Sequence, residues 1–102
     1  MEHGNMTLDY ERENLMKALV TLSVEKVLLK MGTPVYEKVS NKLQKEYKCY
    51  IPDCYNHPEY LESVLKSLYG NSYVAISEAI RDELVEYVHD NNIKTLIKTI
   101  SR

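Results

Sequence analysis

Apolar residues recur at helical spacing along most of this chain. In residues 8–31 a stripe of leucines falls on one helical face, with valines and methionines alongside. The stripe consists of Leu15, Leu19, Leu22 and Leu29. Similar spacing predicts further helices over residues 34–47, 58–69, 72–89 and 93–101. No alternation of strand period extends beyond a few residues, so the pattern predicts an all-α protein, a small bundle of four to five helices.

Glycine and proline mark the ends of the predicted helices. Gly32 and Gly70 follow two apolar stretches, where a left-handed helix end favours glycine. Pro34 and Pro58 come shortly afterwards, and each suits the first turn of a new helix, where an N–H is not needed. These positions separate the predicted helices with short connections.

One connection, residues 48–57, is longer and carries large side chains. It contains Tyr50, Ile51 and Tyr55 together with two cysteines. Because such side chains gain free energy when they leave water, we expect an ordered connection that folds back onto the bundle.

The composition fits a single domain. The chain has 102 residues, 44% of them apolar, with 13 basic and 15 acidic side chains and a net charge of −2. This balance argues against a disordered segment and against a polybasic arm. The longest aliphatic stretches have three residues, so we expect no membrane-spanning helix, and the polar N-terminus predicts no signal peptide. We therefore expect a cytoplasmic protein.

Charge is unevenly distributed along the chain. Residues 26–48 carry six bases and two acids, and Lys38, Lys42 and Lys45 share one face of the second predicted helix. Such a face can follow a phosphate backbone, so a DNA-binding transcriptional regulator is an alternative function. Solvated helix faces are the commoner meaning of this pattern, and the chain has no net positive charge.

Metal binding and catalysis have little support in the sequence. Cys49, Cys54 and His57 are the only candidate zinc ligands that lie close together, and a fourth ligand is not evident. Packing of the two cysteines as small apolar groups is the favoured interpretation. The chain has no Gly-rich phosphate loop, nucleophile elbow or His-Glu-x-x-His pair. We therefore expect no cofactor and no enzymatic activity.

Part of the chain resembles a known family. The resemblance lies in the glycine, proline and aliphatic positions of Val24–Gly32, Leu43, Ile51, Pro52, Pro58, Leu61, Leu65, Leu68–Gly70, Ile76, Ile80 and Leu84. In these positions the chain resembles the archaeal signal-output family called the Nitrosopumilus output domain. The resemblance implies a helical output-domain-like core over residues 24–88, in a single domain spanning 1–102. Residues 1–23 would be an added N-terminal helical segment and 89–102 a short basic amphipathic tail helix.

The resemblance and the first apolar stripe together suggest a function. Residues 8–31 carry more apolar side chains than one small bundle can cover, so we expect part of the stripe to face a second copy. The predicted interface residues are Leu15, Leu19, Leu22, Tyr50 and Tyr55. The resulting hypothesis is a non-enzymatic signalling or regulatory adaptor, a homodimer that also contacts an unidentified signalling protein.

Overall fold

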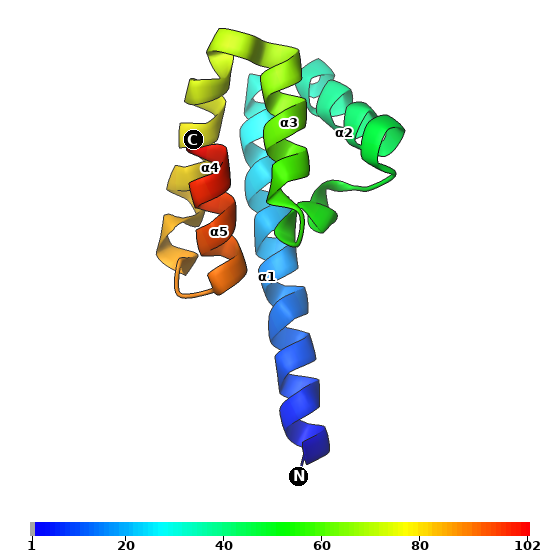
Figure 1. Cartoon of the computed structure of the whole chain (residues 1–102), viewed down its shortest axis with the longest axis vertical. Helices are drawn as coiled ribbons and strands as arrows, with labels where there is room; N and C mark the ends of the chain where they lie inside the picture. The colour runs from blue at the N-terminus through cyan, green and yellow to red at the C-terminus, as the bar shows by residue number, and fades with distance from the viewer. Residues whose placement is uncertain (1) are drawn as a thin grey trace.

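The computed structural model describes the backbone of residues 2–102 and the side chains from Tyr10 onward. Within these residues the chain forms α-helices and short 3-10 helices, without strands, which confirms the predicted all-α bundle (Figure 1). The α-helices are α1 (Glu2–Met31), α2 (Thr33–Tyr47), α3 (Pro58–Tyr69), α4 (Tyr73–Leu84) and α5 (Asn91–Ile100). The 3-10 helices are η1 (Ile51–Tyr55), η2 (Gly70–Ser72) and η3 (Val85–Tyr87).

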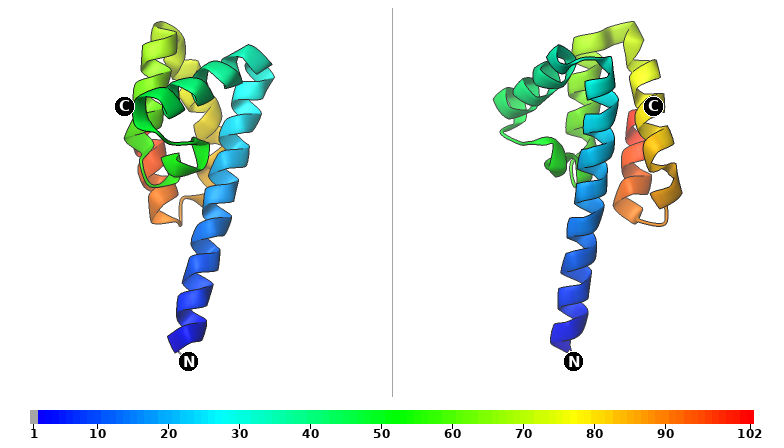
Figure 2. Two further views of the ribbon diagram at one scale, coloured as in Figure 1. Left: turned by 90° about the vertical axis from the view of Figure 1, so that its right-hand side faces the viewer. Right: turned by 180° about the vertical axis from the view of Figure 1, so that it is seen from behind.

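Helix α1 is the spine of the molecule. Its 30 residues span about 45 Å at 1.5 Å per residue, close to the 50 Å longest dimension of the chain. The helices α2 and α4 and the 3-10 helix η1 all contact it, while its N-terminal end extends beyond the other helices (Figures 1 and 2). The helix begins at Glu2, earlier than the predicted residue 8. Residue 1, part of the predicted 1–23 segment, lies outside the described residues.

The predicted helix boundaries hold at both glycines. Gly32 and Gly70 have positive φ angles of 133° and 48°, a region that side chains disfavour. Pro34 lies in the first turn of α2 and Pro58 starts α3, as predicted.

The prediction of a single helix over residues 72–89 was wrong. Helix α4 ends at Leu84, and η3 continues the chain as a tighter turn. The chain must then reverse so that the Asp90 carboxylate can accept a hydrogen bond from the Ile93 N–H, at 3.0 Å, and cap α5. This cap explains why α5 begins at Asn91, two residues before the predicted start.

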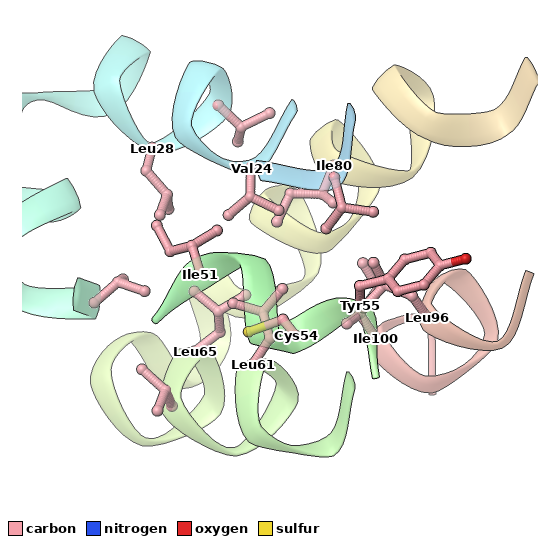
Figure 3. Close-up of a cluster of buried hydrophobic side chains, with 14 of the residues drawn as sticks. Val24, Leu28, Ile51, Cys54, Tyr55, Leu61, Leu65, Ile80, Leu96 and Ile100 are labelled. Carbon is pink, nitrogen blue, oxygen red and sulfur yellow. The ribbon is translucent and has the colours of Figure 1, made fainter. Parts of the chain in front are cut away.

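The connection 48–57 is ordered, as predicted. It contains η1, whose first turn is closed by a hydrogen bond from the Tyr50 backbone N–H to the Asp53 carboxylate, at 2.8 Å. Ile51, Cys54 and Tyr55 are buried, and η1 contacts α1, α3 and α5. Figure 3 shows these three side chains between the helices.

The core joins all the long helices. Val24 and Leu28 of α1 meet Leu61 of α3 and Ile80 of α4 in one buried cluster (Figure 3). Leu96, like Ile100, is fully buried there, so α5 is an integral part of the bundle and not only a tail. Each such side chain contributes roughly 1.5–3 kcal/mol to folding. Among residues 2–102, no helix has both the length and the apolar character needed to cross a bilayer.

Candidate functional site

Helix α1 has apolar residues on two opposite faces, and only one of them is covered. The covered face consists of Met16, Val20, Val24, Val27 and Leu28, each less than 8% exposed. On the other face Leu15, Leu22 and Leu29 are 56%, 64% and 48% exposed. We call these three residues the leucine face. This row of exposed leucines along one helix makes the leucine face the candidate interaction site.

The leucine face has the spacing of a helix–helix contact. Its members lie seven residues apart, and in the sequence the same spacing extends back to Leu8. A straight helix drifts by only about 20° over seven residues, so Leu15, Leu22 and Leu29 stay on one side of α1. Ala18, a small exposed residue, lies between the first two. Helices that pair side by side repeat two apolar positions every seven residues, and the leucines supply one of them.

Leu19 is less exposed than expected for an interface residue. It is partly buried and packs against the core, so it belongs to the edge of the leucine face and not to its centre.

The two charged residues between Leu22 and Leu29 are held away from the line of leucines. The Glu25 carboxylate accepts a hydrogen bond from the Tyr36 hydroxyl of α2, at 3.3 Å. The Lys26 ammonium pairs with the Glu83 carboxylate of α4, at 3.2 Å. These contacts draw the two charges toward opposite neighbours, which leaves the leucines as the main feature between them.

A groove of about 570 Å³ adjoins the leucine face. It lies between the C-terminal half of α1 and α4, with Val27, Ala75 and Ala79 among its apolar lining and Lys30 on its polar part. Glu83, the partner of Lys26, also lines it, so the groove and the leucine face meet at this ion pair.

The N-terminal end of α1 has little packing within the chain. Residues 10–15 are all exposed, and Met16 is the first buried side chain among those that the structure describes in this helix. Figure 2 shows this end of α1 standing clear of the bundle. A helix end without tertiary contacts is marginally stable in water and gains stability from a partner helix.

The two tyrosines that were predicted to lie at the interface differ in exposure. Tyr50 is 65% exposed, but the prediction for Tyr55 was wrong, because Tyr55 is only 5% exposed. Its hydroxyl donates to the Asp90 carboxylate, with distances of 2.9 and 3.0 Å to the two oxygens. Burial, followed by the hydrogen bond to Asp90, raises the pKa of Tyr55 to about 12. Tyr55 therefore joins η1 to the start of α5 inside the protein.

The three residues considered as zinc ligands do not come together. Cys49 and Cys54 are buried free thiols, and burial raises the pKa of both, which makes them poor nucleophiles and poor ligands. His57 is exposed, and its ring stacks on Tyr60 with the ring centres 4.7 Å apart. Among the side chains that the structure describes, no three His, Cys, Asp or Glu residues are placed to share a metal ion.

The predicted basic face lies on α2. Lys38, Lys42 and Lys45 line an open hollow of about 720 Å³ together with Glu46. Lys42 forms an ion pair with Glu46 one turn away, so part of the positive charge is neutralised locally. The hollow is separate in its lining from the groove beside the leucine face.

Comparison with protein-family models, with curated proteins and with solved structures found no match to this chain. The candidate site therefore rests on the geometry of α1 itself. Sequence reasoning found the leucine stripe but missed its seven-residue spacing, which was visible in the sequence. It also missed the Lys26–Glu83 pair, which joins residues 57 positions apart and has no local signal.

Proposed function

We propose that this protein is a non-enzymatic regulatory module that acts as a homodimer, with the leucine face of α1 as its interface. The observation that carries the proposal is the exposure of Leu15, Leu22 and Leu29, by 48–64%, along one side of a helix whose opposite side is packed from Met16 to Leu28. Covering these side chains requires another helix with a matching row.

A second copy of the chain is the occupant that fits best. The leucine face pairs naturally with an identical face, because leucines at seven-residue spacing supply both the projecting side chains and the gaps that receive them. A two-fold pair would cover six half-exposed leucines, and each contributes about 1 kcal/mol when it leaves water. The exposed N-terminal end of α1 would gain a neighbour in the same step.

The regulatory part of the proposal draws on the resemblance of residues 24–88 to the Nitrosopumilus output domain. An output module of this kind passes on a signal by contacting other proteins, so a further contact with an unidentified signalling protein belongs to the proposal. Two unpaired thiols, Cys49 and Cys54, support a cytoplasmic location, where cysteines stay reduced.

Replacing one leucine of the face tests the proposal. Leu22→Glu places a charge at the most exposed residue of the leucine face and should convert the dimer to a monomer, measured by size-exclusion chromatography with light scattering. Helical circular dichroism should be unchanged, because Leu22 has no role in the core. Val85→Glu, at a valine 52% exposed in η3, is the matched control and should leave the dimer intact. An unchanged mass for Leu22→Glu would contradict the proposal.

DNA binding through α2 remains the alternative function. The observation in its favour is that Lys38, Lys42 and Lys45 line one hollow. A regulator of this kind would bind duplex DNA with an affinity that falls steeply with salt. Lys38→Glu and Lys45→Glu should abolish that binding, whereas Leu22→Glu should affect it only through loss of the dimer.

A further inference from the structure

The two halves of α1 carry opposite charge. Residues 2–14 contain four acids and one base, and residues 15–31 contain three bases and one acid. Near the leucine face this polarity is represented by Glu11 in the first half and by Lys30 in the second, both exposed. A helix with this polarity presents a different sign to a partner that runs parallel to it than to one that runs antiparallel.

We infer that two copies pair through their leucine faces in antiparallel orientation, with the two-fold axis near Ala18 and Leu22. The inference rests on the proposed function and specifies the partner as a second copy in one orientation. In this arrangement the acidic half of each α1 lies along the basic half of the other.

The sizes of Ala18 and Leu22 fit a two-fold axis that lies near these two residues. When Ala18 of one copy lies opposite Leu22 of the partner, the small side chain gives room for the large one, and the two-fold axis repeats the contact. Glu11 then lies opposite Leu29 of the partner and within one turn of the partner's Lys30. Lys30 has no ion-pair partner among the described side chains, so its charge is available for this contact.

A parallel pair would lack this complementarity. It would place Glu11 beside Glu11 of the partner and Lys30 beside the partner's Lys30, and like charges at such positions oppose pairing. Acids near the start of a helix and bases near its end also favour the single helix through its dipole. That effect is equal in both orientations, so the choice between them depends on the contacts across the pair.

The antiparallel pair also accounts for the exposed N-terminal end of α1. That end would run past Lys30 of the partner, on the lining of the groove between the partner's α1 and α4. The two bundles would then lie on opposite sides of the paired helices.

Cross-linking between two single-substitution variants tests the orientation. Arg12→Cys and Leu29→Cys proteins, with different tags, are treated with a short bis-maleimide, alone and as an equimolar mixture. The native cysteines are buried and should not react. In the antiparallel pair the two introduced thiols at position 12 are about 24 Å apart along the axis, and those at position 29 about 27 Å apart, so neither variant should cross-link alone. The mixture should give the mixed product.

Light scattering on the same samples separates the possible failures. A dimer that cross-links only in the mixture supports the inference. A dimer in which each variant cross-links alone is parallel, which overturns the orientation but not the proposed function. A monomer, or a dimer that cross-links in no combination, overturns both. Ser67→Cys, at an exposed position of α3, is the control and should not cross-link to Leu29→Cys.

Discussion

Asp90 joins two distant parts of this chain through one carboxylate. It is only 7% exposed, accepts the Tyr55 hydroxyl at 2.9 and 3.0 Å, and accepts the Ile93 N–H at 3.0 Å. The first contact attaches η1, and the second caps α5. A buried carboxylate is retained at modest cost when its oxygens are hydrogen-bonded in this way.

Substitutions of Asp90 should show how much its two contacts together contribute to stability. Asp90→Ala removes the cap of α5 and leaves the buried Tyr55 hydroxyl without its acceptor, so we expect a loss of about 2–4 kcal/mol in the free energy of unfolding. Asp90→Asn keeps an oxygen for both contacts and should cost about 1 kcal/mol. Urea titration followed by circular dichroism measures both. Equal losses for the two variants would contradict this account.

The buried Tyr55 hydroxyl should also make the free energy of unfolding depend on pH. Tyr55 and Tyr73 both have a pKa raised to about 12, chiefly by burial, whereas tyrosine in the unfolded chain titrates near 10. The unfolded chain therefore loses these protons first, and the free energy of unfolding should fall as the pH rises from 10 to 12. Below pH 10 these two groups should contribute no slope. Tyr55→Phe should reduce the slope above pH 10, measured by urea titration at each pH.

Among the elements, α1 shows what the sequence could predict and what it could not. Helical spacing predicted the helix and its apolar character. It could not predict which side is buried, because Leu15 and Leu22 on one side are as apolar as Val20 and Val24 on the other. The choice depends on where η1 and α4 pack, and those contacts join residues far apart in sequence.

Two other predictions were wrong for the same reason, because they depended on contacts between residues far apart in sequence. Tyr55 lies in a connection, where tyrosines are commonly exposed, and its partner is 35 residues away. The end of α4 at Leu84 has no glycine or proline to mark it, and it follows from the reversal that brings Asp90 to the start of α5. By contrast, Gly32 and Gly70 marked their helix ends correctly because backbone geometry is a local property.

Charge reversal on α1 tests how that helix pairs. Glu11→Lys in an antiparallel dimer places a base near Lys30 of the partner and should raise the dimer Kd about threefold to tenfold. Lys30→Glu should do the same, and mixing the two variants should restore the wild-type Kd, measured by sedimentation. Glu78→Lys on α4 changes the net charge equally and should have no effect. An unchanged Kd for Glu11→Lys would point to parallel helices.

At the scale of the whole molecule, the chain is elongated, with extents of 50 × 26 × 21 Å. The elongation comes from α1, whose N-terminal end lies beyond the bundle (Figure 1). A single chain of this shape leaves apolar helix surface in water, and pairing through α1 would cover it in a molecule about as wide as two bundles side by side.

The oligomeric state of the wild-type chain tests the central claim most directly. The measurement is size-exclusion chromatography with light scattering at low and at high salt. We predict twice the 11.9 kDa chain mass under both conditions, because salt screens the charge contacts but not the burial of leucines. A mass of one chain at every concentration would contradict the account, since the leucine face would then have no second copy to cover it.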